Sequence, residues 1–443
     1  MLIFKERKTK LESGSFSVGL PRCWVAFLSE DRLRIKVDSL RVCDVPLNDL
    51  VNELEEKLKN KVKVKFVRFD GEKIEFSFYG NLSREVVKEI VERSLYDYVY
   101  YNSKNVFTGR VVFEIGDDIP LIGTDYFGLI DRGTNLVQVR PVTGCPLNCI
   151  YCSVDEGRFS KTRFLDYVVD LDHLVSEFER VVEFKGGFRI EAHIDGQGEP
   201  MTYPKIFKLI EELREVDGVE VISMQTNGIF LDRRSVRKLA SSGIDRINVS
   251  LNSLKDLVCA RLGGVPSYSV KKIIESIEYA NDLGIHVLIA PVWLKGLNDE
   301  DIEEIILFAK ENLIRVRDWP LLGIQNFEVY KHGRVPKNVK MFPFPRFYKK
   351  LRKLERKYGI KPLKLRPSDF GIHRRRKIPK VFVRGEVDKF RIVAPGRMRG
   401  EFIGVSRGRS VKLVESKMDH ALGDTIRAVI IHTKHNIYSA KPL

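Results

Sequence analysis

Three cysteines stand close together in the segment Cys145-Pro-Leu-Asn-Cys149-Ile-Tyr-Cys152. Thiolates with this C-x3-C-x2-C spacing can bind a [4Fe–4S] cluster and leave one iron without a protein ligand, which makes that iron a chemical site. Zinc is a less favoured alternative, because a closed zinc site takes four ligands and no fourth Cys or His lies nearby in the sequence. Chance packing of three free cysteines is the least favoured interpretation.

Further polar turns follow these cysteines in chain order, each at the end of a short β-rich run. Taken singly, such a turn is equally well explained by loop capping or helix N-capping. Their succession along the chain favours one site that they all share. The turns are residues 195–200 (DGQGEP), 225–228 (QTNG), 250–252 (SLN) and 291–299 (PVWLKGLND).

The β-rich runs alternate with helical segments from about residue 135. This alternation predicts an α/β fold with a parallel barrel, whose chemistry lies at the carboxyl ends of the strands. The cysteines and the polar turns fall at those ends. The expected strands are residues 136–141, 188–195, 219–225, 245–251, 286–294 and 321–330, and the expected helices are 167–184, 203–215, 234–241, 269–283 and 299–313.

The cysteine motif, with Tyr151 in an aromatic position before the last cysteine, resembles that of the radical S-adenosylmethionine (SAM) superfamily. The resemblance implies a partial (β/α)6 barrel, a [4Fe–4S] cluster held by Cys145, Cys149 and Cys152, and SAM as a second cofactor. In such enzymes SAM chelates the open iron. Transfer of one electron then cleaves SAM, and the resulting 5′-deoxyadenosyl radical abstracts a hydrogen atom from the substrate. An external electron donor is therefore an implied partner.

The same resemblance implies which residues contact SAM. Gly198 and Glu199 match a Gly–Glu motif in which exposed backbone and a carboxylate bind the methionyl ammonium. No residue is assigned to the chemistry on the substrate. A satisfied core histidine is favoured for His193 over a residue that reaches the substrate. Further SAM contacts are implied for Tyr151, Thr226, Asn227, Ser250, Asn252 and Asn298.

Three cysteines lie outside the motif. Cys23 and Cys43 are too few to hold a second cluster in the region before the barrel. Cys259 follows the fourth strand, where a buried helix position is favoured over a role in accepting a methyl group or quenching a radical. The role of all three stays open.

Positive charge is concentrated in one part of the chain. The formal net charge is +16, but residues 331–410 hold 26 Lys plus Arg against five acidic residues, a balance of +21 that leaves −5 for the rest. Such a run predicts a surface that binds a polyanion, with nucleic acid favoured over a membrane. We expect RNA, with tRNA as the favoured class.

The end of the chain supports the same partner. Residues 423–432 (GDTIRAVIIH), followed by Tyr438, resemble the end of a TRAM domain, an RNA-binding small barrel of the OB-like kind. The earlier strands of that barrel fit less well, and a docking or oligomerisation barrel is the alternative. Expected phosphate contacts are Arg397, Arg399, Arg407 and Arg409.

Composition limits the class of protein. At 443 residues, with 43% hydrophobic and 31% charged residues, the chain has enough length for about three packed domains. Its longest stretch without Asp, Glu, Lys or Arg, residues 141–154, is too short to span a bilayer, and the charged N-terminus does not resemble a signal peptide. A cytoplasmic location and no membrane partner are expected, and the oligomeric state stays open.

Together these patterns predict a cytoplasmic radical SAM enzyme that modifies RNA, by methyl transfer, methylthio transfer or another reaction. The alternatives are a radical SAM enzyme that acts on a peptide or metabolite, and a non-enzymatic RNA-binding Fe–S protein. Because every cluster and SAM motif lies before Lys331, a chain cut before Arg374 is expected to keep its cluster and still cleave SAM. The expected parts are an α+β domain (1–125), the core barrel (126–330), a basic linker with one helix (331–379) and a TRAM-like β-barrel (380–443).

Overall fold

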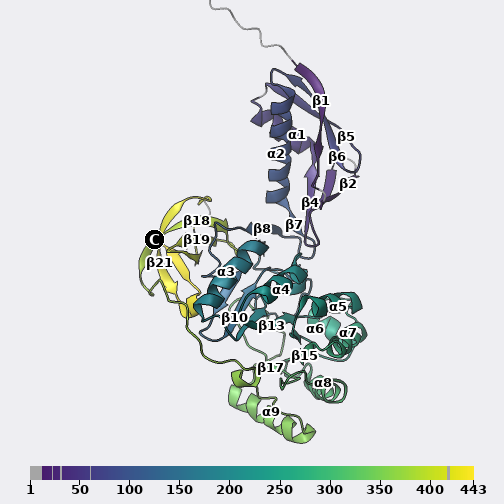
Figure 1. Ribbon diagram of the computed structural model, residues 1–443, viewed down its shortest axis with the longest axis vertical. Coiled ribbons are helices and arrows are strands. Elements are labelled where there is room, and N and C mark those ends of the chain that lie inside the picture. The colour runs from purple at the N-terminus through teal and green to yellow at the C-terminus, as the bar shows by residue number, and fades with distance from the viewer. Residues whose placement is uncertain (1–11, 22, 30–31, 60, 417–419) are drawn as a thin grey trace, which may run out of the picture. The chain divides into compact units, whose positions relative to one another are not determined.

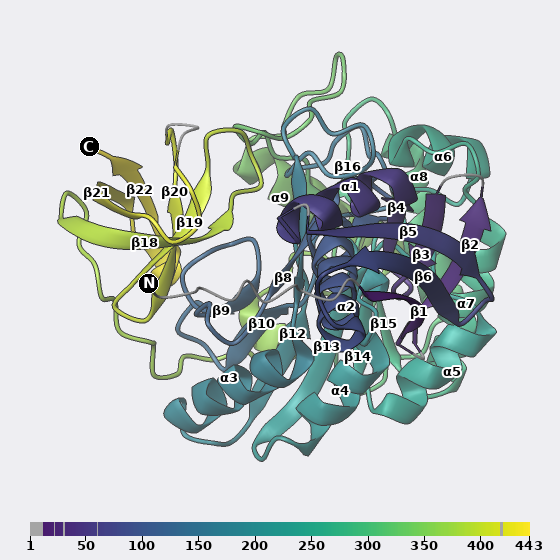
Figure 2. The same ribbon diagram turned by 90° about the horizontal axis from the view of Figure 1, so that it is seen from above.

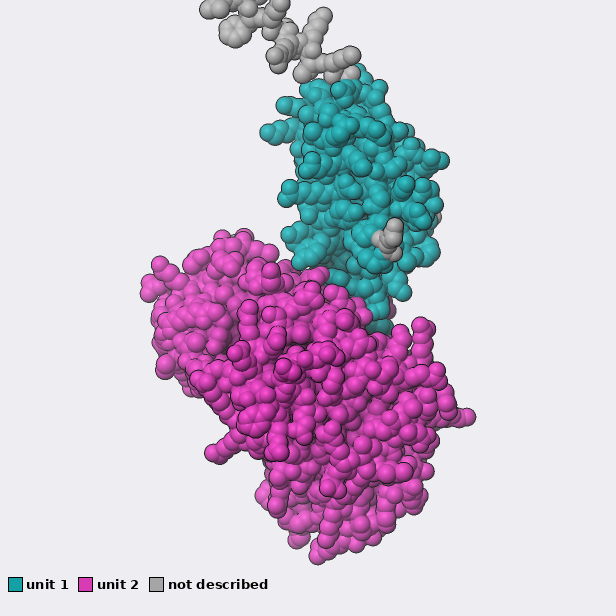
Figure 3. All heavy atoms as spheres, in the orientation of Figure 1, with its two compact units in different colours: residues 1–112 teal, residues 113–443 magenta. Residues whose placement is uncertain are grey.

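The computed structural model describes residues 12–21, 23–29, 32–59, 61–416 and 420–443. The chain divides into two compact units, residues 1–112 and residues 113–443 (Figure 3). Helices and strands are numbered in chain order in Figure 1. Over the described residues, the helices are all too short or too polar to cross a membrane.

Over its described residues, the first unit is an α+β domain with two helices and antiparallel strands in the orders β1-β6-β5 and β2-β3-β4-β7. Alternating apolar side chains of the strands pack with one face of each helix in a single core. This confirms the expected N-terminal fold. The bounds are β1 (Glu12–Gly19), β2 (Val25–Ser29), β3 (Arg32–Lys36), β4 (Arg41–Pro46), α1 (Leu47–Lys57), β5 (Val62–Phe69), β6 (Lys73–Gly80), α2 (Arg84–Asn102) and β7 (Lys104–Asn105).

The second unit contains a six-stranded sheet in the order β15-β14-β13-β12-β10-β9, in which all strands but β9 run parallel. Figure 2 shows α3, α4, α5 and α7 along the outer face of this sheet. The strands β14 and β15 are buried at every residue, as expected where both faces of a parallel sheet are covered. The predicted partial barrel is confirmed. The strands are β9 (Gly128–Asp131), β10 (Leu136–Arg140), β12 (Ile190–Ile194), β13 (Val219–Thr226), β14 (Arg246–Val249) and β15 (His286–Ile289).

The remaining elements of this core connect and flank the sheet. The helix α6 was not predicted, because the sequence between the fourth strand and the next helix lacks a strong amphipathic repeat. The helices are α3 (Leu171–Phe184), α4 (Ile206–Glu215), α5 (Arg233–Ser242), α6 (Asp256–Gly263), α7 (Val270–Asp282) and α8 (Asp299–Asn312), and two further neighbouring strands are β8 (Val111–Ile115) and β11 (Leu165–Val169).

The sixth predicted strand, residues 321–330, is much shorter than expected. Only β17 (Gln325–Asn326) is a strand, and it pairs in parallel with β16 (Val292–Trp293). The Gly323 N–H donates to the Ile289 carbonyl at 2.8 Å, so the chain still runs beside β15. The apolar residues up to Phe327 are buried because this part of the run covers the edge of the sheet, and burial alone does not distinguish a strand from an irregular segment.

The basic segment 331–379 packs on the second unit. Its helix α9 (Phe344–Tyr358) confirms the helix expected there and buries Phe347, Leu351 and Leu354. Further along, the His373 N–H donates to the Asn135 side chain at 2.8 Å. The segment is therefore fixed to the core at more than one point.

The chain ends in a closed five-stranded barrel in the order β18-β19-β20-β22-β21, as predicted. Residues 381–383 form no strand, although Phe382 packs into the barrel core. The barrel is closed by β22, which pairs with both β20 and β21. The bounds are β18 (Val387–Pro395), β19 (Phe402–Ser406), β20 (Arg409–Leu413), β21 (Thr425–His432) and β22 (Ser439–Pro442).

Candidate active site

A cavity of about 710 Å³ opens at the carboxyl ends of the parallel strands. It is lined by segments that follow β10, β12, β13, β14 and β15. The structure thus brings the predicted turns together, with the single exception that Asn298 does not line the cavity. The predicted residues that do are Cys145, Cys149, Tyr151, Cys152, Gly198, Glu199, Thr226, Asn227, Ser250 and Asn252.

The three motif cysteines all face this cavity as free thiols. Burial raises the pKa of Cys149 to about 12, with a further contribution from the neighbouring Cys152, and burial also raises the pKa of Cys145 and Cys152. Buried thiolates need a positive partner, and iron supplies it.

The cysteine loop is held by backbone contacts. The Asn148 N–H donates to the Gly263 carbonyl at 2.8 Å, and the Ile150 N–H donates to the Leu262 carbonyl at 3.0 Å. At Gly264, φ is +64° and an added Cβ would lie 2.3 Å from the Asn148 carbonyl oxygen, so glycine is required where α6 ends against this loop. The end of α6 therefore fixes the first half of the loop.

Arg334, which sequence analysis counted only as part of the basic run, fixes the second half. Its N–H donates to the Cys152 carbonyl at 2.8 Å, and its guanidinium donates to the Cys149 carbonyl at 3.1 Å and to Asp155 at 2.7 Å. The sequence carries no local signal for this role, because the partners are about 180 residues apart.

The turn at Gly198 and Glu199 lies against the residue before Cys145. An added Cβ at Gly198 would lie 2.2 Å from the Gly144 carbonyl oxygen, so only glycine allows this close approach. The Glu199 carboxylate accepts hydrogen bonds from the Thr226 hydroxyl at 2.8 Å and from the Asn227 N–H at 2.7 Å. Thus the turns after β12 and β13 form one unit.

Glu199 is 1% exposed, and burial raises its pKa to about 7. Among the described residues, ion pairs join it to neither a Lys nor an Arg, so its three hydrogen-bond donors are all uncharged. A buried carboxylate in this state is stabilised by any cation that enters the cavity. The arrangement suits a ligand with an ammonium group.

The turns after β14 and β15 hold one another. Asn252 donates from its side chain to the Tyr151 hydroxyl at 2.6 Å and accepts from the Val292 N–H at 2.8 Å. Asn298 is 1% exposed and donates to the Asn252 and Val292 carbonyls, both at 3.0 Å. Asn298 therefore supports the turn behind Asn252, at a distance from the cavity itself.

Other cavity residues were missed or left open by the sequence. His193 lines the cavity with its Nδ1 2.7 Å from the Ser223 hydroxyl, and burial lowers its pKa, which keeps the ring neutral. Cys259 is buried on α6, as expected, and also faces the cavity. Several residues of the basic segment close another side, among them Phe344, Phe347, Tyr348, Lys364, Phe370 and Ile372.

The four arginines expected to contact phosphates differ in exposure. Arg397 is 0% exposed, so that expectation is wrong for this residue. Arg407 is 44% exposed at its side chain but is paired with Glu386 and Asp388. The Arg399 guanidinium lies over the Phe164 ring, 4.6 Å from its centroid. Positive residues in the sequence are thus not equally available to a polyanion.

Comparison with known proteins relates this site to a family. Residues 139–309 match the family model described as the Radical SAM superfamily. The uncharacterized protein MJ0103 of Methanocaldococcus jannaschii is 38% identical over 413 residues, which cover 89% of this chain and 95% of that protein. The GTP 3′,8-cyclase of Thermodesulfovibrio yellowstonii is 31% identical over 192 residues, 42% of this chain and 56% of the cyclase. The matched part thus spans just over half of that enzyme.

Solved structures give weaker matches. The crystal structure of Streptococcus suis SuiB bound to S-adenosylmethionine is 17% identical with a TM-score of 0.38, and the match covers 75% of this chain and 71% of SuiB. The structure of TYW1 with a lysine-pyruvate adduct bound is 17% identical with a TM-score of 0.33, covering 51% of this chain and 74% of TYW1.

Proposed function

This chain belongs to the radical SAM superfamily, and from that premise we propose that it is an enzyme that modifies RNA, with tRNA as the favoured class. The family's cofactors are a [4Fe–4S] cluster and SAM. When both are bound, an electron from an external donor cleaves SAM to a radical that takes a hydrogen atom from the substrate. Different residues of the cavity would bind the cluster, bind SAM and exclude water.

The chain supplies binding, orientation and exclusion of water. Cys145, Cys149 and Cys152 would hold the cluster, and their burial suits thiolates that bind metal. Glu199 would hold the ammonium of SAM, since its carboxylate is buried without a cationic partner. Aromatic residues of the basic segment line the cavity and limit access of water to a reactive intermediate.

The main observation that supports RNA as the substrate is a hollow lined by basic residues, between the segment before β18 and the end of β21. It has a volume of about 280 Å³. The pKa of His435 is lowered by its partial burial and then by surrounding cations, among them Arg132 and Lys377. A concave positive surface of this kind fits phosphate groups of a polynucleotide. The lining residues are Lys377, Lys380, Arg384, Ile431, His432, Thr433, Lys434 and His435.

The closed small barrel beside this hollow also supports RNA, since its final segment resembles that of a TRAM domain. A non-enzymatic RNA-binding protein is less well supported. A non-enzymatic role would not explain why the Glu199 carboxylate and the three motif cysteines line the same cavity. The product of the reaction, by methyl transfer, methylthio transfer or another route, is not specified by these residues.

A second candidate function has an observation of its own. The core matches GTP 3′,8-cyclases, whose name gives a nucleotide as substrate, over 192 residues. The cavity has a volume large enough for a small ligand beside SAM. A free nucleotide is therefore the competing substrate class.

The experiment is mass spectrometry of nucleosides from tRNA and rRNA of cells with and without the gene. Reconstituted, reduced enzyme is then added to tRNA from cells without the gene, with SAM present. RNA modification predicts a change in nucleoside mass that requires SAM and is absent with Cys149→Ala. Unchanged RNA together with consumption of GTP or another free nucleotide would favour the second candidate.

A further inference from the structure

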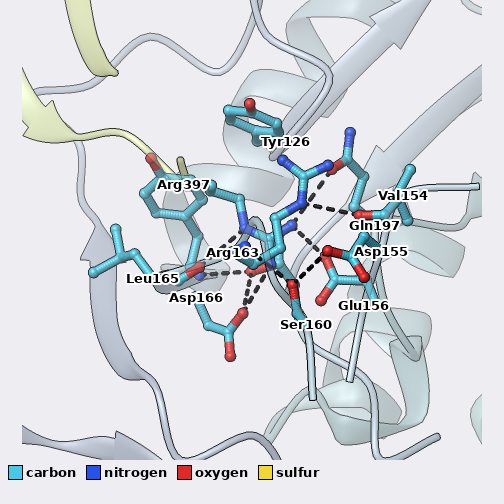
Figure 4. Close-up of polar contacts among 12 residues, drawn as sticks. Tyr126, Val154, Asp155, Glu156, Ser160, Arg163, Leu165, Asp166, Gln197 and Arg397 are labelled. Atoms are coloured by element: carbon cyan, nitrogen blue, oxygen red, sulfur yellow. Dashed lines mark hydrogen bonds and ion pairs between the residues drawn. The ribbon is translucent and has the colours of Figure 1, made fainter. Parts of the chain in front are cut away.

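Arg397 belongs to the C-terminal barrel but lies among residues of the core. It sits in the tight turn between β18 and β19, which is closed by a hydrogen bond from the Gly396 N–H to the Glu401 carbonyl at 2.8 Å. An added Cβ at Gly396 would lie 2.3 Å from the Glu401 Cβ, so the turn requires glycine there. Arg397 is fully buried at 0% exposure, and Figure 4 shows its guanidinium surrounded by polar groups.

Each nitrogen of this guanidinium has a partner from the core. Nε donates to the Leu165 carbonyl at 3.0 Å, and Nη2 donates to Asp166 at 2.8 Å. Nη1 donates to Glu156 and, at 3.4 Å, to the Gln197 side chain. Glu156 and Asp166 are themselves buried, with side-chain exposures of 3% and 0%. One buried cation therefore pairs with two buried carboxylates.

The partners of Arg397 are parts of the cofactor sites. The backbone N–H of Glu156 donates to the Cys152 sulfur at 3.2 Å. Gln197 immediately precedes the Gly198 and Glu199 turn. Asp166 accepts from the hydroxyl of Thr143, two residues before Cys145, at 3.4 Å. Arg397 thus joins the beginning and the end of the cysteine loop to the turn that faces SAM.

Other contacts keep the barrel in this position. The Phe164 N–H donates to the Arg397 carbonyl at 2.9 Å, and the Tyr126 hydroxyl donates to Glu401 at 2.8 Å. Lys412 of β20 pairs with Asp125 at 2.6 Å, and Asp125 in turn accepts from Gln197 at 3.1 Å. The barrel is therefore bound to the core by a network that ends at the SAM turn.

We propose that Arg397 is a positioning residue for both cofactors, so that the C-terminal barrel is a working part of the radical SAM site. Through Glu156 it holds the N–H that points at the Cys152 sulfur. A hydrogen bond to a cluster ligand stabilises the more negative reduced state and so raises the reduction potential. Through Gln197 it holds the turn on which Glu199 meets the ammonium of SAM. This inference does not require RNA to be the substrate.

The test compares Arg397→Met with Arg427→Met, a matched change at an exposed position on β21 of the same barrel. Full-length protein is reconstituted without oxygen, and the midpoint potential of the cluster and the dissociation constant of SAM are measured. For Arg397→Met we expect a more negative midpoint potential and SAM binding weaker by about ten-fold or more. Arg427→Met should leave both values unchanged.

A second variant keeps the proposal testable if Arg397→Met does not fold. Arg397→Lys keeps the charge but lacks the planar fork that reaches four acceptors at once. It should fold, bind a cluster, and show a smaller shift of potential and of SAM affinity in the same directions. Wild-type potential and SAM affinity in a folded Arg397→Met protein, or in Arg397→Lys where Arg397→Met is insoluble, would overturn the proposal.

Discussion

The C-terminal barrel has arginine–carboxylate ion pairs both on the face toward the core and on its exposed surface. On the face toward the core, Arg397 meets Glu156 and Asp166 at 0% exposure. On the outer side, Arg407 meets Glu386 and Asp388 with 44% of its side chain exposed. A buried charge without a partner is costly, whereas an exposed pair is screened by water and contributes little. The buried ion pairs are therefore expected to contribute to the stability of the folded protein, whereas the exposed ion pairs contribute little.

This contrast also explains how the positive charge of residues 331–410 is used. Arg334 and Arg397 form hydrogen bonds with groups of the protein itself, Arg334 with the Cys149 carbonyl and Arg397 with the Glu156 carboxylate. The lysines of the basic hollow, by contrast, line an open surface. A count of charges in the sequence adds both groups together, so the +21 overstates the charge that is available to a polyanion.

The largest effect is expected when Arg397 and Arg407 are each replaced by Ala, which tests the contrast between the buried and the exposed ion pairs. Arg397→Ala should lower the free energy of unfolding by about 3–5 kcal/mol, because two buried carboxylates lose the guanidinium that pairs with them. Arg407→Ala should leave it nearly unchanged. Urea unfolding of the protein without cofactors measures both. Equal effects of the two changes would contradict the distinction between the faces.

Glu199 extends the comparison to a buried carboxylate for which we propose a cation supplied by the ligand. Its pKa of about 7 lies above the usual 4.5, so the folded state binds the proton more tightly than the unfolded state. The contribution of this group to stability is therefore present below pH 4.5 and is lost as pH rises towards 7, on the order of 3 kcal/mol.

Glu199→Gln should remove this part of the pH dependence and weaken SAM binding, while the iron content stays normal. Thermal unfolding between pH 4.5 and 8, compared with wild type, measures the first effect, and SAM titration measures the second. If Glu199→Gln lost iron but kept its SAM affinity, the assignment of Glu199 to the ammonium would be wrong.

The smallest effect is expected on the outer surface. Changing Lys377 and Lys380 together to Ala should reduce the slope of log affinity for tRNA against log salt by about 1–2, since each neutralised phosphate contributes about 0.7–0.9. A matched control changes Lys271 and Lys272, which are exposed on α7, and should leave the slope as it is. The same slope in both double variants would exclude the hollow as a phosphate site.

The sequence predicted those parts of the molecule whose signal is local. The cysteine spacing and the polar turns after each strand identified the cavity, because parallel strands bring their carboxyl ends together whatever the details of packing. What it could not predict depends on contacts between distant residues. Arg397 and Glu156 are 241 residues apart, so a buried arginine could not be told from an exposed one.

Asn298 and the sixth strand illustrate the same limit on a smaller scale. The Asn298 amide faces the Asn252 and Val292 carbonyls, which lie close only after the turns have packed together. Similarly, residues 321–330 have the composition of a strand, but β17 contains only two of them. Residue type correctly indicated the polar turn at Asn298 and the apolar character of residues 321–330. The hydrogen-bond partners of both segments depend on how the core folds and could not be read from the sequence.

The most direct test of the account is SAM cleavage by a chain that ends before Arg374. By motif position alone this chain keeps every cofactor residue. Because we propose that the barrel is part of the site, we expect the truncated protein to lose bound iron and to form 5′-deoxyadenosine from SAM at a small fraction of the full-length rate. A truncated chain that retained a full cluster and the full-length rate would contradict it.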